Sequence, residues 1–375
     1  MRHVAVLLIA VGVSTPLAAQ GNLSTQGYGF PQGQLMSRAL SMGGSIGEID
    51  PSSALNPASL GRLTNRTVLF QIEPEYRTNS LGATTDRTTT ARYPLVSIGV
   101  PFGPRWVIGV SASTLLDRTW ATTSTRSETV SGVPLELTAN EASEGAINDL
   151  RLATAWTNHD WLYVGLGFSG VTGRNVVSTL ELFSDTSFAP LSTTRVLAYS
   201  GSALSAGIQL NSRRMQTVFG LSYRMGNSLT VESNDSTIGR GNVPDRFGAS
   251  VAFTGIQGTV LAARAAYDGW SSMSPMLTGG KAHDSWELGG GAEVSGPRLI
   301  GQTFLLRTGF RARQLPFEAG GRTVNEKAVS FGTGANFGGG RMSTDVTLLR
   351  QWRNADLPSV KERAWTLSLS LTARP

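Results

Sequence analysis

Apolar residues alternate with small or polar residues in many segments beyond residue 64. In the last of these segments every second residue is apolar, namely Trp365, Leu367, Leu369 and Leu371. Side chains of a β-strand point alternately to its two faces, so a period of two predicts a strand with one apolar and one polar face. The chain is therefore expected to be all-β in this region.

Fourteen such segments can be placed along the sequence. They lie near residues 65–78, 89–100, 105–118, 146–157, 161–173, 194–210, 214–225, 243–255, 258–269, 283–295, 299–313, 325–337, 341–352 and 360–372. Single-chain bacterial outer-membrane barrels have an even number of antiparallel strands. The count favours a 14-stranded antiparallel transmembrane β-barrel formed by residues 63–375.

The predicted connections alternate in length. Short turns fall near residues 102–104, 158–160, 212–213, 256–257, 296–298 and 338–340, and long connections near 79–88, 119–145, 174–193, 226–242, 270–282, 314–324 and 353–359. Outer-membrane barrels combine short periplasmic turns with long outer loops. A soluble β-sandwich has no reason to keep this alternation.

Tryptophan residues are expected near both rims of the barrel. Those at strand ends beside short turns are Trp106, Trp156 and Trp161, and those near long connections are Trp120, Trp270, Trp286 and Trp352. Aromatic girdles at both interfaces are typical of membrane barrels. Aromatic residues also cap strands in soluble β proteins, so the pattern supports the barrel without deciding it.

The first 19 residues have the pattern of a secretory signal peptide. Arg2 and His3 precede an apolar core at residues 4–13, and the small residues Ala18 and Ala19 follow. This core is shorter than the roughly 20 residues that span a bilayer as a helix. We expect an exported protein of the Gram-negative outer membrane. A periplasmic or secreted all-β protein would share this leader, and the strand pattern is what argues against it.

The composition excludes several classes of function. The chain has no cysteine and three histidines, which leaves no basis for a disulfide, a thiolate nucleophile or a cysteine–histidine metal site. Basic residues outnumber acidic ones by 32 to 26, but they are scattered along the strands. In a nucleic-acid-binding protein, the basic residues cluster on one face. We predict no metal, no cofactor and no nucleic-acid partner.

Three motifs resemble catalytic sites but lack the context of one. Residues 43–47 match G-x-S-x-G, the nucleophile-elbow motif of serine hydrolases. That motif requires a strand before it, a helix after it, and an acid and a histidine later in the chain, and these are missing here. Glycines 165, 167 and 170 match G-x-G-x-x-G inside one alternating strand. His283 and Asp284 are the one pair that an outer-membrane hydrolase could use as base and acid. No serine can be assigned as the nucleophile that such a pair would activate. We therefore expect that the protein is not an enzyme.

The polar faces of the strands carry charges that would point into the lumen. They are Arg151, Arg264, Arg307, Arg311, Arg313, Glu287 and Glu293. Neighbouring strands hold the two glutamates and the arginines at 307 and 311, so we expect charges to pair there. Salt-bridged lumen charges that avoid lipid are favoured over a selectivity filter.

Residues 20–62 do not alternate and form a separate segment rich in Gly, Ser and Pro. It contains the short motifs Ser37-Arg38-Ala39, Met42-Gly43-Gly44, Asp50, Ser53-Ala54, Asn56-Pro57-Ala58 and Leu60, in this order. With these motifs the segment resembles the region before the first strand in FadL-type outer-membrane hydrocarbon transporters and their PorV-like relatives of type IX secretion. Leu315-Pro316-Phe317, residues 326–331 and Lys361-Glu362 are similar to the PorV-like branch.

This resemblance implies a hatch inside the barrel lumen. The expected hatch residues are Arg38, Ala39, Gly43, Gly44, Asn56, Pro57 and Ala58. The family function implied is passive passage of hydrophobic small molecules, such as long-chain fatty acids or hydrocarbons, across the outer membrane. Its partners are then membrane lipid and a hydrophobic ligand, whose binding residues the sequence does not assign.

Two alternatives stay open at this point. A PorV-like scaffold would hold secreted proteins or secretion-system components and transport no small molecule. A flexible periplasmic tail would account for residues 20–62 without a hatch.

Overall fold

The computed structural model describes residues 22–375, apart from residues 83, 131–132, 186, 278–279, 300 and 358–359. The predicted signal peptide at residues 1–19 lies outside the described residues.

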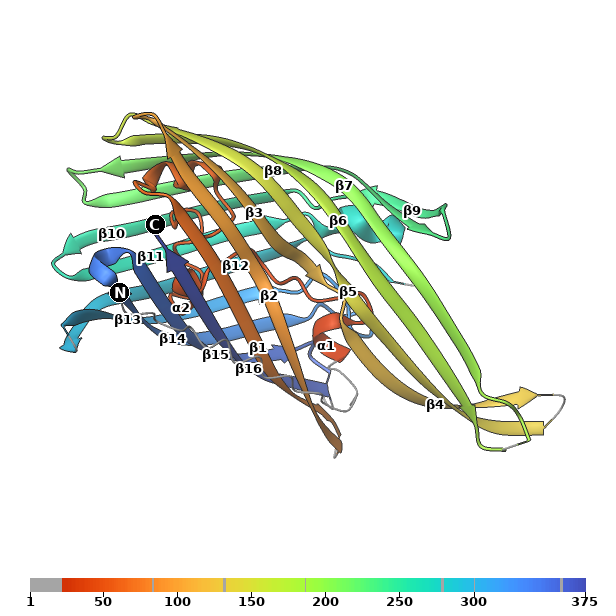
Figure 1. Ribbon diagram of the computed structural model, residues 1–375. Helices are drawn as coiled ribbons and strands as arrows, with labels where there is room; N and C mark the ends of the chain where they lie inside the picture. Colours follow the sequence, from red (N-terminus) through yellow and green to blue (C-terminus); the bar gives the residue numbers. More distant parts are fainter. Residues whose placement is uncertain are drawn as a thin grey trace, which may run out of the picture.

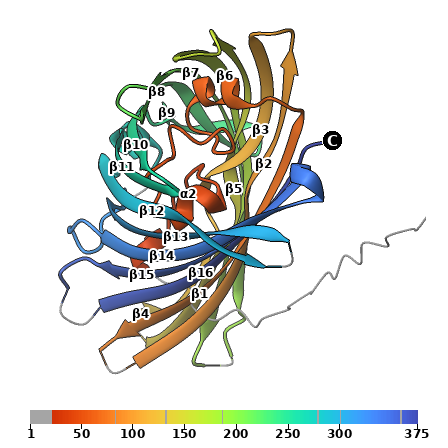
Figure 2. The ribbon, with the colours of Figure 1, turned by 90° about the vertical axis from the view of Figure 1, so that its left-hand side faces the viewer.

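Fourteen antiparallel strands form a closed barrel (Figures 1 and 2). They are β1 (Thr67–Leu81), β2 (Thr84–Phe102), β3 (Trp106–Asp117), β5 (Val133–Thr157), β6 (Leu162–Phe183), β7 (Leu191–Ser212), β8 (Thr217–Ser233), β10 (Arg246–Ile256), β11 (Thr259–Asp268), β12 (Ser285–Leu299), β13 (Gln302–Gln314), β14 (Asn325–Phe337), β15 (Met342–Asn354) and β16 (Val360–Ala373). Each pairs with its neighbours, and pairing of β16 with β1 closes the ring. The predicted fourteen-stranded antiparallel barrel is confirmed.

The alternation of the sequence separates the two faces of the wall. On β3, Trp106, Ile108 and Val110 are exposed, whereas Val107 and Ser111 are buried. The same pattern recurs around the barrel, where Phe70, Leu166, Phe168 and Phe331 are 45–62% exposed. So large an apolar outer surface suits the hydrocarbon of a membrane and not water.

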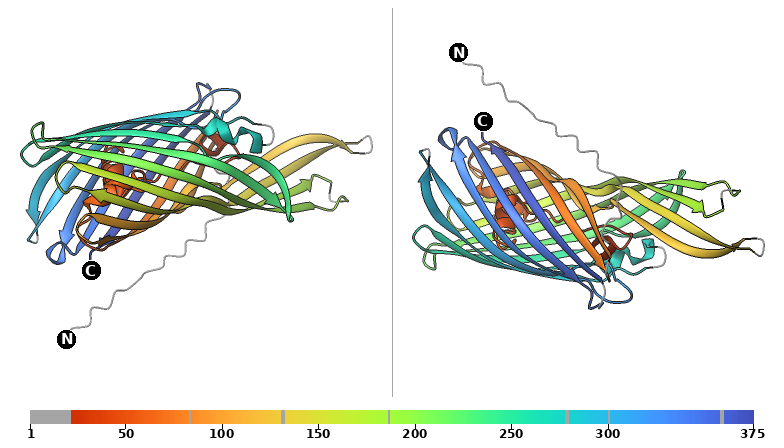
Figure 3. Two further views of the ribbon diagram at one scale, coloured as in Figure 1. Left: turned by 90° about the horizontal axis from the view of Figure 1, so that it is seen from above. Right: turned by 90° about the horizontal axis from the view of Figure 1, so that it is seen from below.

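Two further strands extend the wall beyond the barrel. β4 (Trp120–Val130) pairs with the outer half of β5, and β9 (Ser236–Asn242) pairs with the outer end of β8. β5, β6 and β7 have 25, 22 and 22 residues. With β4 they form an arm that projects from the barrel body (Figure 3).

The expectation of long loops at residues 119–145, 174–193 and 226–242 is therefore wrong. Most of these residues belong to strands β4 to β9. Their outer halves are rich in threonine and serine. Outside a membrane no apolar face is required, so the alternation that reveals a strand is missing there.

Of the seven tryptophans expected in the girdles, four are exposed near the rims, two are only partly exposed, and one is buried. The partly exposed ones are Trp156 and Trp120, and Trp120 lies beside Gly27 of the N-terminal segment. Trp106 and Trp161 are exposed beside short turns, and Trp286 and Trp352 are exposed towards the other rim. Trp270 is only 4% exposed. It begins η2 (Trp270–Met276), which packs inside the outer mouth against β9, so its expected place in the outer girdle is wrong.

The remaining short helices are α1 (Asn22–Thr25), α2 (Ser37–Ser41), η1 (Pro57–Arg62) and η3 (Gly338–Gly340). The first three belong to the segment before β1, which Figure 2 shows within the ring of strands. Among the described residues, no helix has the length and apolarity needed to cross a membrane.

Candidate functional site

The N-terminal segment, residues 22–62, lies across the lumen. Its helix α2 packs against β13, β14, β15 and β16, and η1 packs against β5, β6 and β7. Ala39, Met42 and Ala58 are completely buried. The segment therefore contacts opposite sides of the barrel wall from inside the ring of strands.

The turn after α2 lies directly on the backbone of the wall. Gly43 and Gly44 have φ values of +65° and +80°, a region that favours glycine. A Cβ on Gly43 would lie 2.3 Å from the Phe310 carbonyl oxygen, and a Cβ on Gly309 would lie 2.1 Å from the Gly43 nitrogen. The approach of these two backbones requires glycine on both surfaces.

Asn56 fixes the second contact with the wall. Its side-chain oxygen accepts a hydrogen bond from the Ala58 amide at 2.9 Å, which caps η1, and Pro57 occupies the first position of that helix. Its Nδ2 donates to the Glu48 carbonyl oxygen at 2.7 Å. A Cβ on Gly207 would lie 1.8 Å from Asn56 Oδ1, so β7 accommodates this side chain only because it has glycine there.

Asn56→Ala is expected to loosen the N-terminal segment while leaving the barrel folded. The substitution removes the cap and leaves buried backbone groups without their partners, at a cost of about 1–3 kcal/mol. Hydrogen exchange of the amides at residues 46–62 should become faster, with exchange of the wall strands unchanged. Unchanged exchange across residues 46–62 would contradict this role.

A chain of four charges links the segment to the wall near the short-turn end. Arg38 Nη2 lies 2.9 Å from Glu293 Oε1, and Arg307 Nε lies 2.6 Å from Glu293 Oε2. Arg307 Nη1 then contacts Asp345 at 2.7 Å. Glu293 and Arg307 thus form the pairing expected between these neighbouring strands.

The other sequence-assigned charges have different partners. Arg264 binds Glu48 of the N-terminal segment at 2.7 Å and also pairs with Glu287. Arg151 donates to the Leu55 carbonyl oxygen at 3.2 Å. Arg311 contacts Glu326 and not Glu287. Arg313 donates to the Pro31 carbonyl oxygen at 3.1 Å. Four of the predicted charges therefore contact the N-terminal segment, namely Arg151, Arg264, Glu293 and Arg313.

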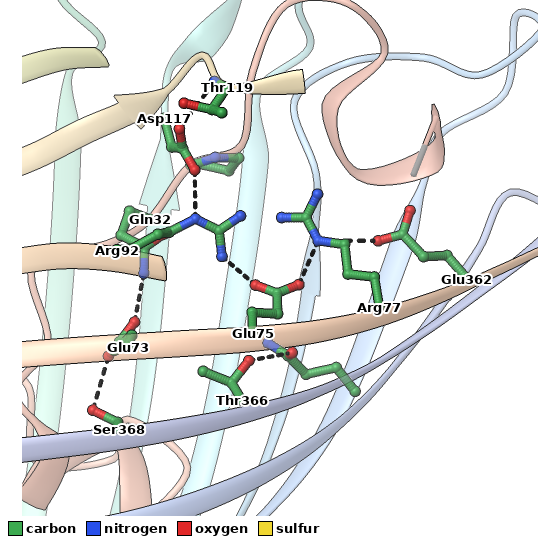
Figure 4. A network of polar contacts seen from close by, with 12 residues as sticks. Gln32, Glu73, Glu75, Arg77, Arg92, Asp117, Thr119, Glu362, Thr366 and Ser368 are labelled. Carbon is green, nitrogen blue, oxygen red and sulfur yellow. Dashed lines mark hydrogen bonds and ion pairs between the residues drawn. The ribbon is translucent and has the colours of Figure 1, made fainter. Parts of the chain in front are cut away.

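A larger network at the outer end of the lumen was missed by sequence reasoning. Arg92 lies between Asp117 and Glu75, and Arg77 lies between Glu75 and Glu362 (Figure 4). Arg353 joins Glu75, Glu326 and Glu362, and Arg313 binds Glu326 at 2.7 Å. One feature of the sequence could have indicated this network. Polar side chains occupy every second position of β1, namely Gln71, Glu73, Glu75 and Arg77.

Phe30 of the N-terminal segment lies at the centre of this network. Its amide donates to the Asp117 carbonyl oxygen at 2.7 Å and its carbonyl oxygen accepts from the Asp117 amide at 2.9 Å. Guanidinium carbons from four strands lie 4.6–5.5 Å from the ring centroid, those of Arg77, Arg92, Arg313 and Arg353. This is cation–π distance on a ring that is 3% exposed.

An apolar cluster fills the outer mouth beside the charged network. It joins inward residues of the extended strands to residues of the outer connections, and includes Leu115, Leu116, Tyr199, Leu229, Trp270, Met273 and Phe317, with Tyr28 packed against them. The Tyr28 and Phe317 ring centroids are 5.3 Å apart. The outer end of the lumen is therefore lined by packed apolar side chains.

The cavities around the N-terminal segment are small. One of about 40 Å³ lies between Pro31, Gln34, Leu115, Trp270 and Trp286 near the outer mouth. A second of about 220 Å³ lies towards the short turns, where Arg38, Asp50 and Asp345 are among the lining residues. Both cavities lie against residues of the N-terminal segment.

His283 and Asp284 do not form the pair considered for a hydrolase. The His283 ring contacts Glu318, while the Asp284 carboxylate accepts from the Tyr267 hydroxyl at 2.5 Å and the Ser271 amide at 2.9 Å. Burial alone would raise the pKa of Asp284, but these hydrogen bonds outweigh it and hold the pKa below its ordinary value. Among the described residues, no cluster of metal-ligating side chains is found.

The chain is similar to known proteins in its fold and not in its sequence. No family model and no curated protein sequence matches the chain. Among solved structures, the chain is similar to a Pseudomonas aeruginosa FadL homologue with 14% identity, a TM-score of 0.63, and coverage of 92% of this chain and 99% of that one. It is also similar to the monoaromatic hydrocarbon channel CymD with 15% identity, a TM-score of 0.56, and coverage of 90% and 96%.

The Pseudomonas putida toluene transporter TodX is a third structure of this kind. It has 10% identity and a TM-score of 0.57, with 92% of this chain and 98% of that chain covered. At such identities the likeness establishes the fold, and the resemblance to FadL-type proteins noted from the sequence is confirmed at that level. Of the three, CymD is described as a channel and TodX as a transporter. The secretion-scaffold alternative stays a prediction.

Proposed function

We propose that the protein is an outer-membrane channel for passive uptake of hydrophobic small molecules, gated by the N-terminal segment acting as a hatch. The observation that supports this best is the apolar cluster at the outer mouth together with an N-terminal segment that packs against opposite sides of the barrel wall. The FadL-type fold and the apolar outer surface of the strands agree with a place in the outer membrane.

In this mechanism a hydrophobic solute first partitions into the apolar cluster under the outer connections. Burial of its surface there is favourable by roughly 25 cal/mol per Å². Movement of the residues around Gly43 and Asn56 away from the wall then opens the path towards the periplasm. Hydrogen bonds and ion pairs that hold the segment, such as Arg38 with Glu293, exchange for water during this step.

A disulfide that ties the segment to the wall should block uptake. Ser37 Oγ of α2 and Ser368 Oγ of β16 are 2.6 Å apart, so the two side chains already point at each other. The chain has no cysteine of its own. Under oxidising conditions, S37C/S368C should reduce uptake of a labelled long-chain fatty acid or hydrocarbon to the level of cells without the protein.

Reduction of the disulfide should restore uptake, and the single variant S37C should transport under both conditions. Cells that lack their own hydrophobic-compound channel provide the assay. If the oxidised double variant takes up the label as fast as the reduced one, the hatch does not gate the channel. If the wild type itself gives no uptake above background, the proposed transport function is wrong.

A further inference from the structure

The outward face of strands β14, β15 and β16 carries positive charges towards the outer end of the barrel. These strands are neighbours in the wall (Figure 1). Their carboxylates, Glu326, Asp345 and Glu362, are 1–6% exposed and face the lumen. Within these three strands every outward charge is positive. The four cations, which we call the basic patch, are Lys327, Arg350, Lys361 and Arg363.

The strand register brings the cations of the basic patch close together. Trp352 is the Cα partner of both Lys327 and Arg363, so these two cations are two strand spacings apart, about 10 Å. Arg350 is opposite Trp365, which places it diagonal to Arg363 at about 7–8 Å. Positive charges at such separations repel one another, and a bound anion removes that repulsion.

The protein does not neutralise the basic patch itself. Lumen arginines bind Glu326, Asp345 and Glu362. Among the described residues, the four cations of the patch form no ion pair with a carboxylate.

Two indole rings hold the central cation of the patch against the wall. The Arg350 guanidinium carbon lies 4.9 Å from the Trp365 ring centroid and 5.7 Å from that of Trp352. These are cation–π distances, which position the guanidinium group without cancelling its charge. The Arg350 side chain is therefore oriented at the outer surface and still able to bind an anion.

Another part of the outer rim is built differently. On β8 the Tyr223 hydroxyl lies 3.4 Å from Asp245, and on β11 the Tyr267 hydroxyl donates to Asp284 at 2.5 Å. Tyr223 and Tyr267 are exposed on the outer face. That part of the rim presents carboxylates with hydroxyl partners, whereas β14 to β16 present cations.

The basic patch lies where the hydrocarbon of a membrane would end. On β15, which begins at Met342 beside a short turn, Arg350 and Trp352 are eight and ten residues further along. A tilted strand of about 9–11 residues spans the membrane. The outward residues before them, such as Val346 and Leu348, are apolar. Cations on a lipid-facing surface are tolerated at the interface and costly at the midplane.

We infer that the basic patch binds a lipid of the outer leaflet whose head group carries two phosphate groups. Arg350 and Arg363 bind one phosphate, which guanidinium groups contact through paired hydrogen bonds. Lys327 and Lys361 bind the other, because four cations spread over two strand spacings exceed the span of a single phosphate. The acyl chains then lie along Leu348 and its Cα partner on β16. This inference concerns the outer wall and is independent of passage through the lumen.

Titration of the full protein in detergent, followed by native mass spectrometry, tests the inference. The probes are diphosphoryl lipid A, dephosphorylated lipid A with the same acyl chains, and inorganic phosphate. The wild type should bind the diphosphoryl form at least about tenfold more tightly than the dephosphorylated form. R350Q/R363Q should weaken binding of the diphosphoryl form about tenfold and change that of the dephosphorylated form by less than about twofold.

Two further variants complete the test. K327Q/K361Q leaves Arg350 with both indole rings and should also weaken binding of the diphosphoryl form. Arg341→Gln removes an exposed positive charge at the short-turn end of β15 and should bind all probes as the wild type does. Inorganic phosphate at the same concentration as the lipid should not compete.

Several results would overturn the inference. Either double variant could keep the wild-type affinity for diphosphoryl lipid A, or the dephosphorylated form could bind equally well. An equal loss in Arg341→Gln would mean that any surface charge serves. Competition by inorganic phosphate would indicate a site for the free anion and not for a lipid.

Discussion

Glu326→Gln is expected to destabilise the barrel by about 3–5 kcal/mol, the cost of leaving a buried ionic network without one of its charges. Glu326 contacts three arginines, with Arg313 Nε and Arg353 Nε each at 2.7 Å and Arg311 Nη2 at 3.2 Å. It is 1% exposed, and its strand β14 joins β13 and β15, which hold these arginines. The amide keeps the shape of the carboxylate but removes its charge.

Urea titration of the protein refolded in lipid vesicles measures this loss as a shift of the unfolding midpoint. Asp160→Asn is the matched control. Asp160 pairs with Arg213 at 2.8 Å, but the two side chains are 56% and 82% exposed. An exposed pair of this kind contributes about 0–1 kcal/mol. If the two variants shifted the midpoint equally, the buried network would not be the stabilising feature described here.

Gly309→Ala is expected to displace the N-terminal segment from the wall. The added methyl group would lie 2.1 Å from the Gly43 nitrogen and 2.2 Å from the Met42 carbonyl carbon. Both neighbours are backbone atoms, so no side-chain rotation relieves the clash. The turn after α2 must move, and ion conductance of the barrel in planar bilayers should rise at least several-fold above that of the wild type.

Gly170→Ala provides the control for this experiment. Gly170 also lies in the barrel wall, on β6, but a Cβ there would have no neighbour within 4 Å. Its conductance should match the wild type. Trypsin should cleave residues 22–62 faster in Gly309→Ala than in Gly170→Ala. Wild-type conductance and wild-type protease resistance in Gly309→Ala would contradict the close contact at Gly43.

Most of the barrel could be predicted from the sequence because a membrane imposes a simple rule on it. A lipid-facing residue must be apolar, and the next residue faces the lumen, where serine, glycine or arginine is accepted. β14, for example, spans Asn325–Phe337, the predicted residues 325–337. Where the wall leaves the membrane, as in β4 and the outer halves of β5 to β7, that rule no longer applies, and the sequence pattern predicts loops instead of strands.

The arrangement inside the lumen was less accessible to sequence reasoning. The four guanidiniums around Phe30 come from β1, β2, β13 and β15, residues up to 276 positions apart in the chain, and only the strand register brings them together. Phe30 itself lies in a segment without periodicity. The glycines at 43, 165, 207 and 309 could be seen in the sequence, but their contacts with the N-terminal segment could not.

The measurement that tests the central claim most directly is native mass spectrometry of the protein purified in detergent without added lipid. We expect a barrel that carries one hydrophobic small molecule, with the adduct reduced in Gly309→Ala because the segment that covers the site is displaced. A ligand-free barrel that instead carries stoichiometric protein partners would contradict uptake of hydrophobic molecules and would favour a secretion scaffold.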